Sequence, residues 1–508
     1  MVWIRKKIEQ PLHGRGSCHP ALPVVSGIRW GGSGKFLCPL DDRAVSSSVP
    51  RSPFRPMALH EAGLGGVRAL QRDCDRTAQA DKHILPIYLM MVTSPLSTEQ
   101  ILETMMTQTL TEATKAIVRA TAPALASHGT EITAAMYKRL FENAEVRNLF
   151  NQSNQGEGGR QTKALAQAIL AYAQNIDNLA VLTSAVERIA QKHVGLHIRP
   201  EHYPHVATAL LNAIKDVLGE AATDEILNGW GEAFWFLANI LIEREGQIYN
   251  SLQASEGGWN GWRQFAVVSK RRESDIITSF VLRPVDGGAV ISHRPGQYLT
   301  FRFDIPGLPP QHRNYSISSA PNAESYRISV KRETHGLVSR FLHDQVEEGA
   351  VIEVAPPTGD FHLPTGQERP VVLLSGGVGL TPMVSMLETI ANDGREVPVH
   401  YVHGAENGRV HAMGSHVRDI AKDREHLKTT IFYGSPHAQD QRGVHFDHDG
   451  LITVEWLARN TPIAEADFYL CGPRPFLAVF VNGLAKAGVP QDRIHYEFFG
   501  PADELAAA

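Results

Sequence analysis

A histidine on an apolar helical stripe is the residue of this sequence whose type and place best suit metal-centred chemistry. Leu182, Val186 and Ile189 precede His193 at steps of four, three and four residues, so on a helix the four side chains share one face. An imidazole there faces buried surroundings. Backbone carbonyls can satisfy its ring nitrogens, as in most core histidines. Alternatively, one nitrogen ligates a haem iron while the other meets a hydrogen-bond acceptor.

A carboxylate stands in a similarly unusual place further along the chain. Apolar residues lead to Glu245 at steps of three or four, namely Leu227, Trp230, Phe234, Leu237 and Leu241. An unpaired buried carboxylate is costly, so Glu245 either has a partner or reaches water near the helix end. His193 and Tyr203 are the candidate partners.

Length and composition indicate a soluble protein of several domains. The chain has 508 residues, 43% of them hydrophobic and 20% charged, which is ordinary for globular protein but too long for one domain. The net charge of -5 leaves no basic footprint for nucleic acid, and the longest apolar run, 233–242, is too short to span a bilayer. Cys471 is the only cysteine beyond residue 95, and no metal-binding cysteine spacing occurs, which fits a reducing cytoplasm.

Residues 1–95 differ in composition from the rest of the chain. Residues 1–82 hold 13 Lys and Arg against 7 Asp and Glu, and Gly, Pro and Ser are frequent. Because no helical or strand period persists, we expect a disordered extension, or upstream sequence translated from an early start codon. A transit peptide or a basic interaction arm is the alternative, and we assign no function to this segment.

Helical periodicity from about residue 105 to residue 252 predicts an all-α domain. The capping-box pattern Thr109-x-x-Glu112 opens its first helix, which Pro123 interrupts and Gly129 can close. Thr130 then caps a second helix. Further helices are expected from about Gln161, through His193, and over 223–249.

After Gly257-Gly258-Trp259 the pattern changes from helix to strand. Short β-prone runs occupy 263–271, 276–283, 297–303, 314–319, 325–332 and 350–355. Strands without intervening helices predict an antiparallel β-barrel. From Pro370 strands and helices alternate, which predicts an α/β domain with a parallel sheet and right-handed crossovers.

A glycine-rich loop follows the first strand of that α/β region. The apolar run 371–375 leads through Gly376-Gly377-Val378-Gly379-Leu380-Thr381-Pro382 into a helix expected over 383–391. Glycines let the backbone approach a diphosphate closely, and a helix N-terminus favours its charge. The spacing differs from the G-x-G-x-x-G dinucleotide fingerprint.

From about residue 109 to its C-terminus, the chain resembles the flavohaemoglobins. In the helical part the resemblance rests on 151–155, Ile189-Ala190-Gln191-Lys192-His193, 199–203 and Arg244-Glu245-x-x-Ile248-Tyr249-Asn250. In the remainder it rests on 294–298, Arg313-Asn314-Tyr315-Ser316, 357–361, the glycine-rich loop and Cys471-Gly472-Pro473. These segments of the remainder have the form of a ferredoxin-reductase-like module.

The resemblance implies a haem site in the helical domain. His193 would be the proximal ligand, with Glu245 accepting a hydrogen bond from its ring and Tyr203 beside it. An anionic acceptor gives the imidazole imidazolate character, which favours O2 activation over storage. Tyr137 would donate to bound oxygen on the distal side. The remaining pocket residues that the resemblance implies are Phe150, Gln161, Leu165 and Lys192.

The resemblance also implies an FAD site and an NAD(P) site. Arg313 would hold the flavin diphosphate by its bidentate fork, and Ser316 would donate near the flavin N5. The other implied flavin residues are Tyr298, Asn314, Tyr315, Glu497, which would also contact Lys192, and Phe499, which would lie over the flavin ring. The nicotinamide nucleotide would occupy the glycine-rich loop and Cys471-Gly472-Pro473, with Cys471 as small packing rather than a nucleophile. Phe498 occupies a position at which we expect Cys in members of the family.

The expected organisation is a globin over 105–252, an FAD-binding β-barrel over 258–365 and an NAD(P)-binding α/β domain over 366–508. With haem b, FAD and NAD(P)H as cofactors, the resemblance implies a cytoplasmic, monomeric nitric oxide dioxygenase that forms nitrate from nitric oxide and O2. An NADH oxidase or hydroperoxide reductase of the same cofactors stays open, as does an O2 or nitric oxide sensor. Lipid in the distal pocket and the choice between NADH and NADPH also stay open.

Overall fold

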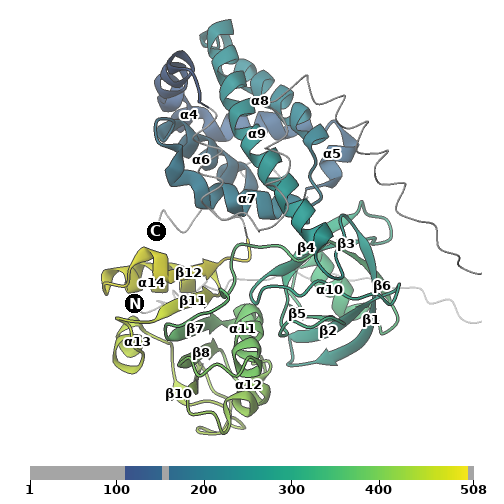
Figure 1. Ribbon diagram of the computed structural model, residues 1–508, viewed down its shortest axis with the longest axis vertical. Helices are drawn as coiled ribbons and strands as arrows, with labels where there is room; N and C mark the ends of the chain where they lie inside the picture. Colours follow the sequence, from purple (N-terminus) through teal and green to yellow (C-terminus); the bar gives the residue numbers. More distant parts are fainter. Residues whose placement is uncertain (1–108, 151–159, 501–508) are drawn as a thin grey trace, which may run out of the picture. The chain divides into compact units, whose positions relative to one another are not determined.

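The computed structural model describes residues 109–150 and 160–500, and the expected extension 1–95 lies outside them. Within the described residues a helical part is followed by an antiparallel sheet and then by a parallel sheet, as the sequence predicted (Figure 1). Among the described helices, none combines the length and the hydropathy needed to cross a bilayer.

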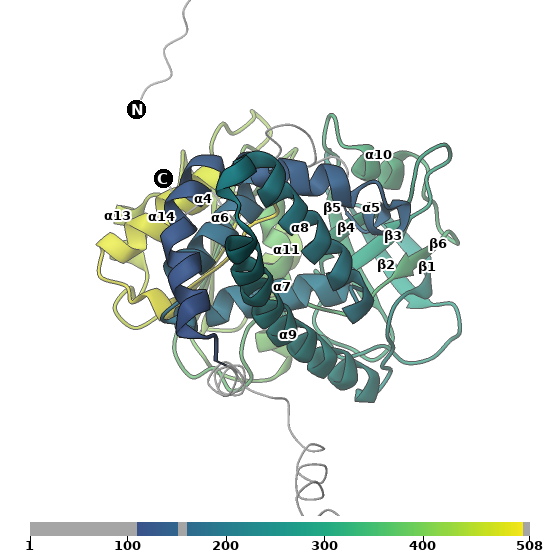
Figure 2. The same cartoon turned by 90° about the horizontal axis from the view of Figure 1, so that it is seen from above.

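The helical part packs around one apolar core. Its helices are α4 (Glu112–Leu140), α5 (Ala144–Asn148), α6 (Arg160–Gln174), α7 (Thr183–Gly195), α8 (Tyr203–Leu218) and α9 (Asp224–Ala254). Helix α4 contacts α6, α8 and α9, and α7 contacts α9. Helices α8 and α9 also contact one another, and Figure 2 shows them side by side. The core includes Val118, Ile132, Met136, Val186, Ala190 and Ile240.

Helix α4 is one continuous element where the sequence predicted two. Pro123 lies inside it and removes one backbone hydrogen bond, yet the helix continues. Gly129 does not end the helix, because it is buried where an added Cβ would lie 3.5 Å from the Cβ of Ala166 on α6. Residues on both sides of Pro123, such as Val118 and Ile132, are buried, and this tertiary packing outweighs the local breaker signals.

Helix ends agree with the sequence in some places and differ in others. Thr111, not Thr109, caps α4, and its hydroxyl accepts from the Thr114 N–H at 3.1 Å. Thr223 caps α9, and the helix continues to Ala254 rather than ending at residue 249. Helices α5 and α8 were not predicted. The signal for α8 was Pro204 in its first turn, where the missing N–H costs nothing.

The antiparallel sheet has six strands in the order β4-β3-β6-β1-β2-β5. They are β1 (Arg263–Arg272), β2 (Ile277–Pro284), β3 (Tyr298–Phe303), β4 (Gln311–Ser316), β5 (Tyr326–Lys331) and β6 (Val351–Val354). A bridge between Ile317 and Ile328 brings the two edge strands together and closes the barrel. Strand β4 begins earlier than predicted, because Gln311 and His312 are buried and pair with β3. Helix α10 (Leu337–Asp344), which was not predicted, buries Val338 and Leu342 in the barrel core.

The parallel sheet has the order β10-β9-β8-β7-β11-β12 and is covered on both faces (Figure 1). Its strands are β7 (Val371–Gly376), β8 (Val399–Ala405), β9 (Leu427–Tyr433), β10 (His448–Asp449), β11 (Asp467–Cys471) and β12 (Ile494–Glu497), and its helices are α11 (Leu380–Asn392), α12 (Gly414–Ala421), α13 (Val454–Asn460) and α14 (Arg474–Lys486). Leu373 faces the cluster of α11 and α12, whereas Leu374 faces that of α13 and α14.

Two ends in this region differ from the predicted ones. Helix α11 begins at Leu380 rather than at residue 383, because Pro382 fits its first turn without a lost hydrogen bond. Strand β12 ends at Glu497, so Phe498 and Phe499 follow the strand instead of belonging to it.

Gly379 lets the loop after β7 approach the end of β11. An added Cβ would overlap the carbonyl of Cys471 and lie 2.8 Å from the Gly472 nitrogen, and backbone atoms cannot move aside. We therefore expect Gly379→Ala to destabilise the parallel-sheet part by about 1–3 kcal/mol. Hydrogen exchange of the β7 and β11 amides measures this loss. Gly404→Ala is the matched control, because the nearest atom to its Cβ would be the flexible Cδ1 of Ile452 at 3.3 Å, and the nearest backbone atom would lie at 3.9 Å. Equal losses in both variants would contradict the prediction.

Candidate functional site

Three helices bring the predicted polar residues of the helical part together. His193 lies on α7, Tyr203 begins α8 and Glu245 lies on α9. The Oε1 atom of Glu245 accepts from the Tyr203 hydroxyl at 2.6 Å and lies 2.8 Å from His193 Nδ1. The Tyr203 hydroxyl is itself 3.2 Å from that nitrogen. The sequence left open whether Glu245 has a partner or reaches water, and the structure shows that it has partners.

The carboxylate is the most deeply buried member of this triad. Glu245 is only 2% exposed, and its Oε2 atom has no hydrogen-bond partner within the described residues. Burial and the neighbouring carboxylate raise the pKa of Tyr203 far above its usual value, so the phenol stays a neutral donor. Because both contacts of the imidazole use Nδ1, its Nε2 atom is left for a ligand. This donor set fits a haem iron held by Nε2.

Aromatic side chains gather at the end of α4, where the distal residues were predicted. The rings of Tyr137 and Phe150 lie 5.7 Å apart and edge to face. Phe141 completes the cluster at 5.4 Å from Tyr137 and 5.3 Å from Phe150. The sequence analysis missed Phe141, although its place one helical turn after Tyr137 was a usable signal. Leu165 on α6 packs against the same core, and Gln161, in the first turn of that helix, is half-buried.

The predicted flavin residues lie on two paired strands of the barrel. Tyr298 on β3 pairs with Ser316 on β4, and both are buried. The backbone of Thr358 exchanges hydrogen bonds with that of Tyr298, at 2.9 and 3.0 Å, so the segment 357–361 joins the same site. Burial lowers the pKa of Arg313 and raises that of Tyr315. The half-buried Arg313 guanidinium fits a flavin diphosphate, whereas Asn314 is exposed.

The two predicted nucleotide segments lie at the carboxyl ends of two neighbouring strands of the parallel sheet. Strands β7 and β11 are neighbours, so the glycine-rich loop lies beside Cys471-Gly472-Pro473. Gly377 has φ +56°, and nothing lies within 4 Å of the place where its Cβ would be. This open backbone at the start of a helix fits a diphosphate. The Phe476 ring, which the sequence analysis did not name, packs against Gly376 and Gly472.

Cys471, Glu497 and Phe499 lie where β11 and β12 end. Cys471 is fully buried, and burial, followed by the Glu497 carboxylate, holds its pKa well above the usual value, so the thiol is no nucleophile. Burial also raises the pKa of Glu497 to about 7, against the opposing charge of Lys192. The contact between Lys192 and Glu497 that the resemblance implied stays a prediction. Phe499 is 48% exposed, and Phe498 packs against the sheet.

Residues of α7 other than His193 contact the flavin segment 357–361. The Gln191 side chain accepts from the Gly359 N–H at 3.1 Å, and Arg188 forms an ion pair with Asp360 at 3.4 Å. The sequence analysis assigned no contact to Arg188 or to the Gln191 side chain, although each lies within about two turns of His193 on a helix. These contacts tie the helix that bears His193 to the flavin strands.

Comparisons with known proteins place all three parts in one family. Family models match a globin at 132–241, an oxidoreductase FAD-binding domain at 264–363 and an oxidoreductase NAD-binding domain at 373–482. A flavohemoprotein of Xylella fastidiosa (strain 9a5c) is 56% identical over 392 residues, covering 77% of this chain and 97% of that protein. One of Rhodopirellula baltica is 46% identical over 407 residues, covering 78% of this chain and 100% of that protein. The chain belongs to the flavohemoprotein family.

A solved structure agrees with this assignment. The flavohemoglobin of Malassezia yamatoensis with bound FAD and haem superposes with a TM-score of 0.69 at 27% identity, covering 77% of this chain and 100% of that one. The flavohemoprotein described here is accordingly an NAD(P)H-dependent oxidoreductase that joins a globin to FAD-binding and NAD-binding domains.

The hydrogen bond from Tyr203 to Glu245 should stabilise the flavohemoprotein more than an ordinary buried one. We expect Tyr203→Phe to lower the free energy of unfolding by about 1.5–3 kcal/mol, because the acceptor is charged. The control Tyr172→Phe removes a bond of 2.9 Å to the neutral carbonyl of Ala233 from a tyrosine of similar burial, and should cost about 0.5–1.5 kcal/mol. Chemical denaturation followed by far-ultraviolet circular dichroism compares the two. A smaller loss at Tyr203 than at Tyr172 would contradict a charged acceptor.

Proposed function

We propose that this flavohemoprotein is a nitric oxide dioxygenase, which oxidises nitric oxide with O2 to nitrate at the expense of NAD(P)H. The observation that carries the proposal is the shared acceptor Glu245 Oε1, which lies 2.8 Å from His193 Nδ1 and 2.6 Å from the Tyr203 hydroxyl. A globin that only stores oxygen needs neither this carboxylate nor a fused reductase. The pairing supports a haem tuned for oxygen chemistry.

The proximal residues act through charge. Glu245 sits in a low-dielectric site, where its attraction for the His193 N–H proton is weakly screened. The imidazole thereby gains imidazolate character, and Tyr203 fixes the carboxylate by a second bond. When bound, haem iron supplies O2 binding and one-electron chemistry, and FAD converts the hydride of NAD(P)H into single electrons.

The distal and reductase residues bind and orient. We assign the Tyr137 hydroxyl to donation toward the negative end of bound oxygen, and Phe150 and Leu165 to exclusion of water. Arg313 would hold the flavin diphosphate, and Ser316, buried on β4, would donate near the flavin ring. The open Gly377 backbone would receive the nucleotide diphosphate.

The proposal extends to the organisation and setting of the protein. We assign the haem to 105–252, FAD to 258–365 and the nicotinamide nucleotide to 366–508. The substrates are small molecules, and we place the protein in the cytoplasm as a monomer.

Oxygen-dependent consumption of nitric oxide is the direct test. Protein loaded with haem and FAD, supplied with NADH, should remove nitric oxide rapidly at an electrode when O2 is present and form nitrate. Without O2 the removal should stop. Arg313→Ala should abolish turnover, because the flavin loses its diphosphate clamp. Oxidation of NADH without loss of nitric oxide would instead assign an oxidase or hydroperoxide reductase. Full gas binding without turnover would assign a sensor.

Haem retention tests the ligand assignment separately. We expect His193→Ala to lose haem while keeping FAD, because the iron loses its protein ligand and the barrel is untouched. The ratio of haem to flavin absorbance in purified protein measures this. His205→Ala, at an exposed position on α8, is the matched control and should keep both cofactors. A His193→Ala protein with normal haem content would refute the assignment.

A further inference from the structure

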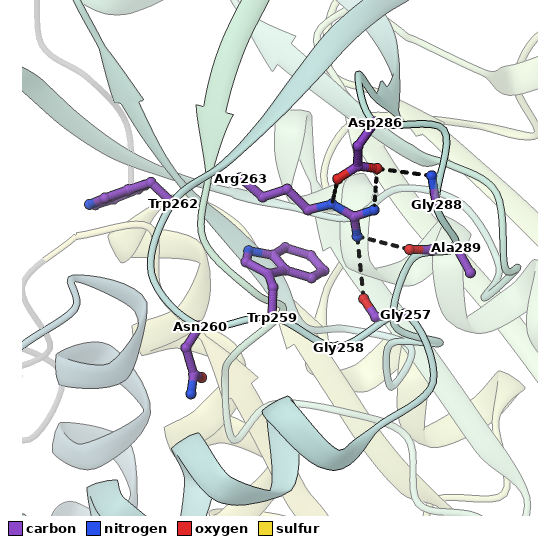
Figure 3. Close-up of a pocket in the computed structure, with 9 residues that line it drawn as sticks. All are labelled: Gly257, Gly258, Trp259, Asn260, Trp262, Arg263, Asp286, Gly288 and Ala289. Carbon is purple, nitrogen blue, oxygen red and sulfur yellow. Dashed lines mark hydrogen bonds and ion pairs between the residues drawn. The ribbon is translucent and has the colours of Figure 1, made fainter. Parts of the chain in front are cut away.

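An arginine clamps the segment that joins α9 to β1. Arg263 donates from Nε and Nη2 to the two carboxylate oxygens of Asp286, at 2.9 and 2.6 Å (Figure 3). Its Nη1 donates to the carbonyls of Ala289 at 2.8 Å and of Gly257 at 3.3 Å. The clamp therefore connects the linker, through Gly257, to the turn that follows β2.

Backbone geometry makes this contact tight. Gly257 has φ +69°, and an added Cβ would lie 2.6 Å from the carbonyl carbon of Val290 and 2.7 Å from that of Ala289. Only glycine satisfies both conditions without strain. The linker thus runs against the segment after β2 at backbone contact distance, with the Arg263 side chain, only 14% exposed, bridging the two.

Two tryptophans fix the same linker on the barrel. Figure 3 shows Trp259 beneath the Arg263 guanidinium, which lies 5.4 Å from the ring centroid. The Trp259 indole donates to the Val354 carbonyl of β6 at 3.2 Å. Trp262 lies 5.2 Å from the His312 ring, and the Arg302 guanidinium lies 5.2 Å from Trp262. The linker is therefore held by side chains rather than left as a flexible tether.

Helix α9 transmits this constraint toward the haem site. The helix carries Glu245 and ends at Ala254, directly before the linker. Leu252, in its last turn, packs against both the helical core and the barrel core. If the linker became mobile, α9 would move with it as one helix, and this movement would displace Glu245 and the His193 ring that it contacts.

We propose that Arg263 is a positioning residue for electron transfer, which fixes the direction of α9 by clamping the linker to Asp286. The proposal rests on the proposed passage of electrons from flavin to haem, and not on the identity of the oxidised gas. Joined domains move relative to one another unless their contacts prevent it. Electron transfer slows steeply with distance, because orbital overlap decays between the two centres. The clamp touches no residue assigned to a cofactor, so its loss should slow only the step between the modules.

Stopped-flow measurements on the full-length, cofactor-loaded protein separate the two electron steps. NADH reduces the flavin first, which is read as flavin bleaching, and haem reduction is then trapped by carbon monoxide. In Arg263→Lys the point charge remains but the bidentate fork is lost. We expect unchanged flavin bleaching and haem reduction slowed about tenfold, because the freed linker lets the two cofactor-binding modules move apart.

The control replaces an arginine elsewhere on the barrel, one that forms an ion pair away from the linker. Arg283 on β2 bonds Glu324 at 2.9 Å in an exposed pair that does not touch the linker. Arg283→Lys should keep both rates of the native protein. Asp286→Asn provides a milder second variant, because Asp286 is exposed and its replacement leaves the Arg263 packing in place. It should slow haem reduction less than Arg263→Lys does.

Hydrogen exchange gives a readout that does not depend on activity. Amides of 255–262 should exchange faster in both clamp variants, whereas those of β1 and β2 should not change. Native exchange together with native haem reduction would overturn the proposal. So would flavin bleaching slowed as much as haem reduction, because the defect would then lie in the reductase. Slowed haem reduction in the clamp variants, together with a native protein that consumes no nitric oxide, would support the clamp and remove the dioxygenase proposal, so the two fail separately.

Discussion

The hydrogen bonds that meet the buried Glu245 carboxylate are the interaction on which the proposed haem site depends. An anion that is 2% exposed is tolerable only when donors meet it, and those donors come from two other helices. Helices α7, α8 and α9 must therefore pack in one arrangement, with His193 and Tyr203 turned toward the same oxygen. The long, continuous α4 supports this arrangement by contacting α6, α8 and α9. In the proposed function the same carboxylate that orders the helices also raises the electron density of the imidazole.

Close backbone approach plays the corresponding role in the reductase part. Gly379 admits the end of β11 beside the glycine-rich loop, and Gly359, with φ +121°, admits the Tyr298 ring. Both contacts lie beside the residues that we propose for binding the nucleotide and the flavin. Helix α9 connects the helical part to the barrel, because it carries Glu245 and leads into the linker that Arg263 holds.

Local sequence patterns predicted much of the fold and of the candidate site. The strand limits of the barrel were predicted to within a few residues, because β-prone runs and turn residues mark them locally. His193 and Glu245 stood out because polar groups on apolar stripes are costly. The errors lay where tertiary packing outweighs local signals: Pro123 and Gly129 failed to end α4, and α8 was overlooked. Phe141 and Phe476 were missed because a single aromatic residue looks like ordinary core.

The sequence by itself determined the order of the three parts, the period of each and the residue types able to bind haem, flavin and nucleotide. These follow from local periodicity and from chemistry that a side chain carries wherever it lies. Only the tertiary structure showed that Glu245 contacts both His193 and Tyr203. Only the tertiary structure likewise showed that Arg263 donates to both Gly257 and Asp286. Such contacts join residues far apart in the chain, and their distances depend on how whole elements pack, which no local pattern encodes.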